Sequence, residues 1–175
     1  QLNIGLIVNC LTEAERMWVD GPQTTNLDMI DDNDQELNGP LRIALEAMAV
    51  AARSGRPILI HCQAGISRSG AIAVGWIMMT RRMTFEDALT HVRLGRKKIE
   101  PNLGFCVQIE TLEPALIGGF DIDLGFVDEH VRVYHQFEPI VVPQLTAEDE
   151  VYRQHPRLPS MIPGAAHPTE GVRLT

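Results

Sequence analysis

Residues 58–70 read Ile-Leu-Ile-His-Cys-Gln-Ala-Gly-Ile-Ser-Arg-Ser-Gly, the most informative segment of the chain. Its three apolar residues, 58–60, predict a buried strand, and the apolar segment that continues to Thr80 predicts a buried helix. Residues 61–69 form a short loop between them. Backbone N–H groups converge in such a loop, and the start of the helix adds unpaired donors and a partial positive charge. The stretch therefore predicts an anion-binding site built from main-chain groups.

Reactive side chains stand at both ends of this loop. Cys62 opens it, so its sulfur is expected at the base of the anion site, where donors that bind phosphate also stabilise a thiolate. A cysteine thiol ordinarily has a pKa of about 8.5, and such surroundings lower that pKa by several units. Arg68 closes the loop, and its planar guanidinium can hold two phosphate oxygens at once. Ser69 is placed to donate a hydrogen bond to the sulfur, Gly65 suits a tight turn, and His61 is expected to orient the cysteine backbone.

A plainer interpretation treats Cys62 as an inert buried thiol and Arg68 as a solvated charge. It would be favoured for an isolated cysteine, since most free cysteines are buried and unreactive. By chance, the combination of His-Cys, Gly65, the spacing to Arg-Ser and the final glycine occurs in a chain of this length on the order of once in ten thousand. The sequence therefore favours a catalytic loop.

Two stretches of the chain resemble a known family. The loop is similar to the His-Cys-x5-Arg-Ser/Thr motif of the protein tyrosine phosphatase superfamily, and its Ala-Gly-x-Ser-Arg-Ser form resembles the dual-specificity branch. Residues 101–109 (Pro-Asn-Leu-Gly-Phe-Cys-Val-Gln-Ile) are similar to that branch's Pro-Asn-x-Gly-Phe-x-x-Gln-Leu motif. The resemblance covers roughly residues 1–117 and places the family's first strand before Gln1. It implies a central sheet flanked by helices and metal-free hydrolysis of phosphotyrosine and phosphoserine or phosphothreonine.

The resemblance also implies roles for individual residues. Cys62 is the nucleophile, Arg68 holds the phosphate and stabilises the transition state, and Ser69 assists the departure of the sulfur. The substrate phosphate is expected to bind the loop residues Gln63, Ala64, Gly65, Ile66, Ser67 and Arg68. His61 and Asn102 are expected to support the loops of the site.

The family's general acid is an aspartate on a loop upstream of the cysteine, where this chain offers Asp28, Asp31, Asp32 and Asp34. A gap-free placement of Leu37 on the family's helix-start pattern aligns Asp31 with that aspartate. The alternation of Leu27 and Met29 with Asp28 also predicts a short strand that leads to it. Asp32 is the rival, because one deletion in the loop would select it instead. The remaining carboxylates are expected to be solvated loop charges.

Strands alternate with helices along the chain, which predicts an α/β fold with a central, mainly parallel sheet flanked by helices. Besides 58–60, strands are expected at 4–8 and 27–29, with a loop at 18–26; helices are expected at 12–16 (one turn), 40–55 and 70–80, after Thr84 and after Asn102. Residues 1–118 are expected to form the catalytic domain. Residues 119–175 are expected to form a proline-rich, partly irregular extension with strands at 131–134 and 140–142.

Composition narrows the function classes. The net charge is −8 and the longest basic run is residues 96–98, so neither nucleic acid nor an anionic membrane is an expected partner. The longest apolar run, 71–79, is too short to span a bilayer. Three cysteines and the absence of a leader-like N-terminus predict a cytoplasmic protein, with the nucleus as the alternative. The six histidines lack metal-ligand spacing, so no metal or other cofactor is expected.

Two function classes fit these observations. The first is a cysteine-dependent phosphatase with a phosphoprotein substrate; the neutral loop residues Gln63, Ala64 and Ile66 favour proteins over phosphoinositides. The alternative is a pseudophosphatase, a module that binds phosphorylated partners with little or no turnover. A sulfur-transferring enzyme is disfavoured because its cysteine loop is usually one residue shorter. Low-molecular-weight phosphatases and arsenate reductases also use a Cys-x5-Arg motif, but near the chain start, whereas here it lies in the middle of the chain.

Overall fold

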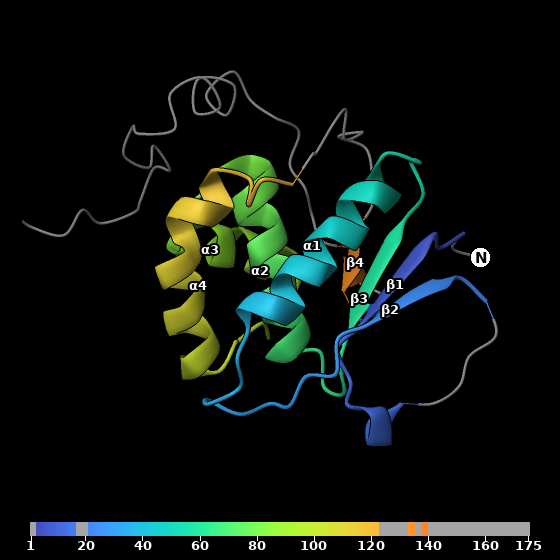
Figure 1. Cartoon of the computed structure of the whole chain (residues 1–175), viewed down its shortest axis with the longest axis horizontal. Helices are drawn as coiled ribbons and strands as arrows, with labels where there is room; N and C mark the ends of the chain where they lie inside the picture. The colour runs from blue at the N-terminus through green and yellow to red at the C-terminus, as the bar shows by residue number, and fades with distance from the viewer. Residues whose placement is uncertain (1–2, 17–20, 123–132, 136–137, 140–175) are drawn as a thin grey trace, which may run out of the picture.

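The computed structural model describes residues 3–16, 21–122, 133–135 and 138–139. Five strands form one sheet in the order β2-β1-β3-β4-β5 (Figure 1). They are β1 (Leu6–Asn9), β2 (Gln23–Asn26), β3 (Ile58–His61), β4 (Val133–His135) and β5 (Glu138–Pro139). The first four are parallel, and β5 pairs antiparallel with β4. The mainly parallel sheet that the sequence predicts is therefore confirmed.

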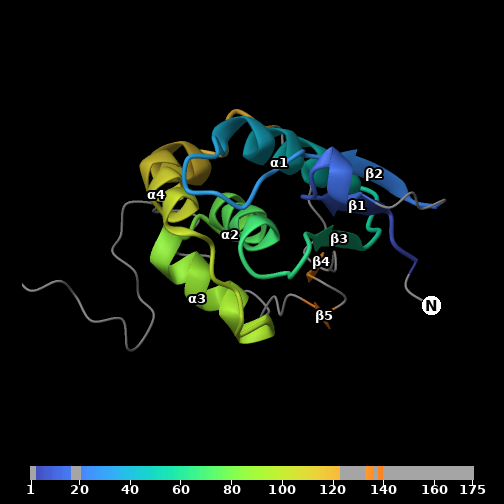
Figure 2. The same ribbon diagram turned by 90° about the horizontal axis from the view of Figure 1, so that it is seen from below.

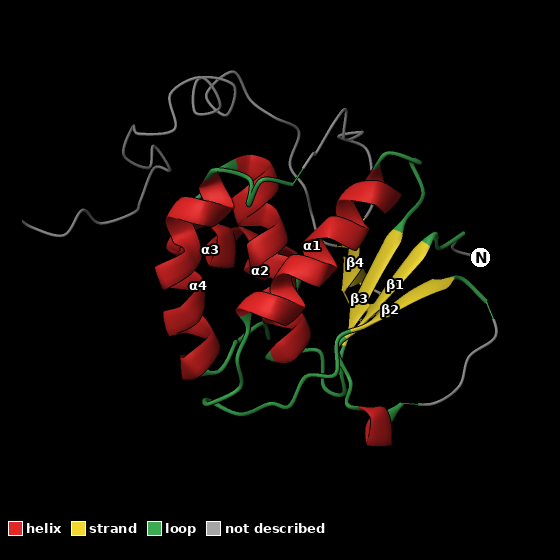
Figure 3. Cartoon of the chain, viewed as in Figure 1, coloured by secondary structure: helices red, strands yellow, loops and turns green. Residues whose placement is uncertain are grey.

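Four helices gather to one side of the strands (Figure 3). They are α1 (Asn38–Ala52), α2 (Arg68–Arg81), α3 (Phe85–Gly95) and α4 (Leu103–Ile117), and a short 3-10 helix, η1 (Glu13–Glu15), follows β1. Seen from below, α2 lies between α1, α3 and α4 (Figure 2). Twelve of the 14 residues of α2 are buried, as an all-round apolar helix requires. The position of α2 fixes the loop that precedes it.

The helix ends follow from capping chemistry. Thr84 accepts a hydrogen bond from the backbone N–H of Asp87 at the start of α3, and Asn102 accepts one from Phe105 at the start of α4. The predicted inner face of α1 is also confirmed, because Leu41, Leu45, Met48 and Ala52 are all fully buried. These helices thus form where local sequence favours them.

The prediction of a strand at residues 27–29 is wrong. The strand in this region is β2 (Gln23–Asn26), which lies inside the segment expected to be a loop. The ladder ends where Leu27 donates its N–H to the carbonyl of Asn9. Asp28 then turns the chain out of the sheet, because its φ of 55° lies in the left-handed region. Its carboxylate accepts a hydrogen bond from Glu13 and pairs with Arg16, which holds this turn in place.

Part of the predicted extension joins the sheet. β4 lies beside β3 and overlaps the strand expected at 131–134, ending one residue later, and β5 follows it. The strand expected at 140–142 lies outside the described residues. None of the helices in the described part of the chain is both long and apolar enough to cross a membrane.

Candidate active site

The site lies where the parallel strands end, at the edge at which ligands bind in open α/β sheets. The loop of residues 62–67 connects β3 to α2, and the loop after β2 and the turn η1 reach the same edge (Figure 1). Cys62 is the first residue after β3 and is only 5% exposed. The sheet and α2 therefore bring the predicted nucleophile and the start of a helix together.

Ser69 contacts the sulfur as the sequence predicts. Its Oγ donates a hydrogen bond to Sγ of Cys62 over 3.1 Å, and both side chains are buried. A hydroxyl donor stabilises a thiolate more than a thiol, and it is equally placed to stabilise the sulfur when a bond to phosphorus breaks. Ser69 sits in the first turn of α2, so the helix fixes the direction of this hydrogen bond.

A second cysteine lies beside the nucleophile. Cys10 follows β1 and donates its backbone N–H to the carbonyl of His61 over 2.9 Å, one register step from Cys62. Burial first, and then the charge on Cys62, raise the pKa of the Cys10 thiol well above its ordinary value, against an opposing effect of Arg68. Cys10 is therefore a protonated thiol at neutral pH.

Arg68 is held on one side by the chain itself. Its Nη1 donates to Oε2 of Glu15 over 2.7 Å and to the carbonyl of Met29 over 3.1 Å, and its Nη2 donates to Oε1 of Glu15 over 3.3 Å. Desolvation lowers its pKa, but the hydrogen bonds to Glu15 and the charges of Cys62, Glu15 and Asp31 outweigh it and raise that pKa above its ordinary value.

One donor of Arg68 is still to be satisfied. Its Nε is buried and has no hydrogen-bond partner among the described residues. A buried guanidinium N–H is costly to leave unpaired, so its presence next to an anion-binding loop calls for a bound acceptor. Arg68 can thus bind Glu15 with its Nη atoms and a phosphate oxygen with Nε.

Glu15 is the functional residue that the sequence analysis missed. It lies on η1, where its Oε2 accepts hydrogen bonds from the backbone N–H and the hydroxyl of Thr12, both over 2.9 Å. The hydrogen bond from Arg68, followed by those from Thr12, lowers its pKa to about 2. The Thr12-x-x-Glu15 spacing of a capping box was the available indication. It predicts the turn, but it does not predict that the carboxylate reaches Arg68.

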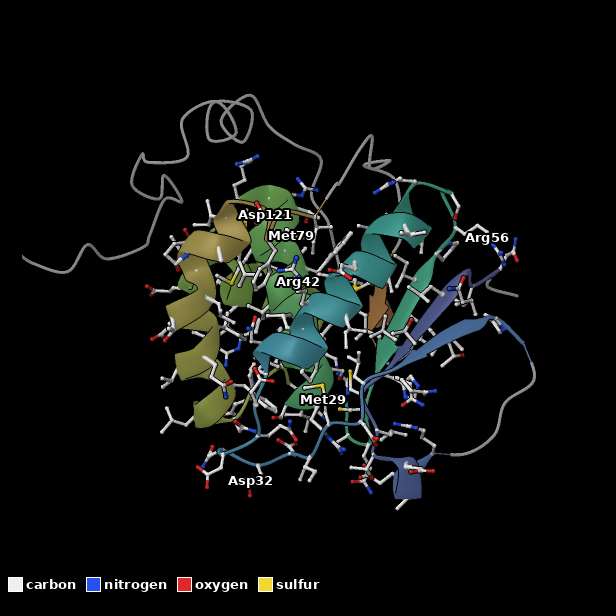
Figure 4. All side chains as sticks on the ribbon, in the orientation of Figure 1. Met29, Asp32, Arg42, Arg56, Met79 and Asp121 are labelled. Carbon is white, nitrogen blue, oxygen red and sulfur yellow. The ribbon has the colours of Figure 1, made fainter. Side chains whose placement is uncertain are left out.

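Asp31 lies next to the loop of residues 62–67, the phosphate loop. Its Oδ1 accepts hydrogen bonds from Oγ of Ser67 over 2.5 Å and from Nδ2 of Asn102 over 2.9 Å. The carboxylate of Asp32 instead accepts the backbone N–H of Asp34, and Figure 4 shows Asp32 at the outer edge of the loop. The two rival carboxylates therefore have different surroundings. Only Asp31 of the pair bonds to a residue of the phosphate loop through its side chain.

The remaining predicted loop residues stand between the nucleophile and Arg68. Gln63 and Ala64 are exposed, Ile66 is half-buried, and Gly65 takes a φ of 64°, which favours glycine. Arg96 holds this turn through two hydrogen bonds, to the carbonyl of Gly65 over 2.9 Å and to that of Ala64 over 3.4 Å. These contacts use the carbonyls of the loop and leave its N–H groups to an anion.

His61 lies at the end of β3 and is half-buried. Burial lowers the pKa of its imidazole, while a hydrogen bond to the backbone of Cys62 works in the opposite direction. This bond joins the imidazole to the nucleophile's main chain, where the sequence analysis expects it. In the described part of the chain, no cluster of three or more His, Cys, Asp or Glu side chains has the geometry to hold a metal ion.

Comparisons with known proteins agree with this geometry. The family model for the catalytic domain of dual specificity phosphatases matches residues 1–114. The chain is 31% identical to mouse dual specificity phosphatase 28 over 113 residues, which are 65% of this chain and 69% of the mouse protein. It is 37% identical to the tyrosine-protein phosphatase vhp-1 of Caenorhabditis elegans over 95 residues, which are 54% of this chain and 14% of the nematode protein. The chain thus spans about two thirds of the mouse protein but far less than two thirds of the nematode protein.

Solved structures give the same result. The crystal structure of human DUSP28 superposes with a TM-score of 0.61 at 29% sequence identity, covering 65% of this chain and 77% of that one. A human tyrosine phosphatase-like serine/threonine/tyrosine-interacting protein superposes with a TM-score of 0.61 at 27% identity, covering 64% and 78%. Both superpositions thus cover about two thirds of this chain.

Proposed function

Because the chain belongs to the dual specificity phosphatase family, we propose that it hydrolyses phosphotyrosine and phosphoserine or phosphothreonine in proteins through a phosphocysteine on Cys62. The observation that carries this proposal is the buried Nε of Arg68, which has no partner among the described residues and adjoins the loop that Cys62 opens. It is a fixed donor for a phosphate oxygen. The neutral side chains of Gln63, Ala64 and Ile66 support a protein substrate rather than a phosphoinositide.

In the first step the thiolate of Cys62 attacks phosphorus. The S–P bond forms, the bond to the ester oxygen breaks, and that oxygen leaves with its electron pair and takes a proton from Asp31. Arg68 and the N–H groups of the loop hold the non-bridging phosphate oxygens, whose charge grows in the transition state. A positioned acid contributes about 10²–10⁴-fold to such a step.

In the second step water attacks the phosphocysteine. The carboxylate of Asp31 takes a proton from the water, an O–P bond forms, and the S–P bond breaks with its electron pair on sulfur. The hydroxyl of Ser69, 3.1 Å from Sγ, stabilises the departing thiolate. Inorganic phosphate leaves, and both Cys62 and Asp31 return to their starting protonation states.

The alternative function, binding of phosphorylated partners without turnover, needs Arg68 and the loop but neither the nucleophile nor the acid. The chain carries Cys62, Ser69 and a carboxylate at 31 in contact with the loop, which supports turnover. The odd, sparse set of three cysteines supports a location in the reducing cytoplasm or nucleus.

Pre-steady-state hydrolysis of p-nitrophenyl phosphate tests the proposal. We expect a burst of p-nitrophenol close to one equivalent of protein, and Cys62→Ser should abolish both the burst and the steady-state rate. Phosphotyrosine and phosphothreonine peptides then test dual specificity. A wild-type chain that binds phosphopeptides but releases no phosphate would establish the binding function instead.

A further inference from the structure

Two segments that are distant in sequence donate hydrogen bonds to one oxygen of Asp31. Oγ of Ser67 in the phosphate loop donates to Oδ1 over 2.5 Å, and Nδ2 of Asn102 at the start of α4 donates to the same atom over 2.9 Å. The triangle is closed by the backbone N–H of Asn102, which donates to Oγ of Ser67 over 3.0 Å. Hydrogen bonds from the side chains of Ser67 and Asn102 therefore set the position of the Asp31 carboxylate.

The amide of Asn102 does more than cap α4. Its Oδ1 performs the cap by accepting the N–H of Phe105 over 2.9 Å. Its Nδ2 takes no part in capping and bonds to Oδ1 of Asp31 and, over 3.3 Å, to the carbonyl of Asp32. Serine, threonine and aspartate cap helices as well as asparagine does, but asparagine alone among them carries an NH2 donor. The NH2 group of Asn102 therefore holds Asp31 while the amide oxygen of the same side chain caps the helix.

The loop around Asp31 is fastened to α4 at two further places. The N–H of Gly104 donates to Oδ1 of Asn33 over 3.2 Å, and the approach is so close that a Cβ at position 104 would overlap the carbonyl of Asn33. One turn later, Gln108 accepts the N–H of Leu37 over 2.8 Å and donates to the carbonyl of Gln35 over 2.9 Å. Residues 31–37 are thereby bound along the first two turns of α4.

We propose that Asn102 and Ser67 are positioning residues that fix the carboxyl of Asp31 for proton transfer, with Oδ1 held by both donors and Oδ2 carrying the proton. This inference rests on the proposed function, in which Asp31 is the acid. A fixed geometry raises the efficiency of proton transfer because no orientational freedom has to be lost in the transition state. Ser67 also precedes Arg68, so the same hydroxyl ties the acid to the phosphate clamp.

The experiment compares two substrates that differ in their need for an acid. Phenyl phosphate has a poor leaving group and needs the proton, whereas difluoromethylumbelliferyl phosphate has a good one. Asn102→Ser keeps a capping oxygen but removes the amide donor, and Ser67→Ala removes the other donor. For each variant we expect kcat for phenyl phosphate to fall about 10- to 100-fold, no more than the 10²–10⁴-fold that a general acid contributes in full. We expect kcat for the good leaving group to change less than about threefold.

Two controls separate positioning from general damage. Asn38→Ser makes the same change at the exposed first residue of α1 and should leave both substrates unaffected. In the background of Asp31→Asn, Asn102→Ser should cause almost no further loss on phenyl phosphate, because the group that it positions is already gone. An equal loss on both substrates, or an additive loss in the double variant, would overturn the proposal.

A readout without turnover keeps the inference separate from the proposed function. Amide hydrogen exchange in residues 31–37 should quicken in Asn102→Ser relative to Asn38→Ser, since that loop loses one of its attachments to α4. Unchanged exchange would overturn the positioning role even if the wild type showed a full burst. Conversely, a wild type with no Cys62-dependent burst would disprove the phosphatase function while exchange could still show that Asn102 orders the loop.

Discussion

The two loops of the site are built in opposite ways. The phosphate loop, residues 62–67, is a single segment whose ends are fixed by a buried strand and a buried helix, and its key side chains are at most 8% exposed. The acid loop, residues 27–37, has no strand or helix of its own and is largely exposed. It owes its position to side chains of Ser67, Asn102 and Gln108 on other segments.

This difference separates binding from proton transfer. The groups that bind an anion and carry the nucleophile lie close together in sequence, so the site binds phosphate wherever β3 and α2 are intact. In the proposed mechanism, the acid acts only if Asn102 at the start of a distant helix holds it in place. Changes to the groups that bind phosphate or carry the nucleophile should therefore affect every substrate. Changes to Asp31, or to the side chains of Ser67 and Asn102 that hold it, should affect substrates in proportion to their need for a proton.

The largest effect should come from Arg68→Lys. Lysine keeps the charge, but its single ammonium cannot bind Glu15, the carbonyl of Met29 and a phosphate oxygen in the fixed directions of the guanidinium. We expect kcat/KM to fall about 10²–10³-fold on good and poor leaving groups alike, the usual cost of losing a transition-state donor. Arg42→Lys on α1 is the matched control. A loss confined to poor leaving groups would contradict this role.

The next effect should come from the acid. Asp31→Asn should lower kcat for phenyl phosphate about 100-fold, because the rate no longer gains from a protonated carboxyl at this position. It should lower kcat for difluoromethylumbelliferyl phosphate only severalfold. Asp32→Asn is the matched control, because its carboxylate bonds to Asp34 at the edge of the loop, and it should stay within about twofold of wild type. If Asp32→Asn produced the leaving-group effect instead, the assignment of the acid would be wrong.

These two predictions differ in how far the sequence alone supports them. The phosphate loop could be predicted residue by residue, because strand, loop and helix are contiguous and each has a local pattern. The helix caps at Thr84 and Asn102 were predictable for the same reason. Asp31 needed a family alignment as well, since four nearby carboxylates have the same local chemistry.

What could not be predicted depends on contacts between distant segments. The prediction of a strand at 27–29 was wrong because Asp28 adopts a left-handed conformation. In that conformation its carboxylate contacts Glu13 and Arg16, which lie 12 or more residues away. Glu15 reaches Arg68 across 53 residues of sequence, and neither residue's neighbours indicate the other. Hydrophobic period and turn chemistry report local preferences and carry no information on such pairs.

A smaller effect is expected from Glu15→Gln. The variant keeps the size of the side chain but removes the charge that aligns Arg68, so kcat/KM should fall about tenfold on both classes of substrate, less than when the guanidinium itself is replaced. Glu13→Gln, an exposed change on the same turn, should have no effect. An activity equal to wild type in Glu15→Gln would show that the charge of Glu15 is not needed to orient Arg68.

The pH dependence of stability tests the same ion pair. The pKa of Glu15 is lowered from 4.5 to about 2, so its contribution to stability is complete above about pH 4.5 and is lost as the pH falls toward 2. Urea denaturation of wild type and Glu15→Gln should therefore give a difference that is constant between pH 5 and 8 and shrinks below pH 4. A difference that grows on acidification would contradict the pairing.

The smallest effect should come from Gly104→Ala, and its sign is informative. In the first turn of a helix, alanine usually stabilises relative to glycine by up to about 1 kcal/mol. Here the added Cβ overlaps the carbonyl of Asn33, so the acid loop must move away from α4, and we expect a net destabilisation of about 1–3 kcal/mol in chemical denaturation. Turnover of phenyl phosphate should fall severalfold while the burst with an activated substrate persists, because the phosphate loop is not disturbed. Val107→Ala, an exposed change one turn along α4, controls for effects on the helix itself. A Gly104→Ala variant that is more stable than wild type would mean that the acid loop yields at no cost, and its attachment to α4 would then be too weak to position Asp31.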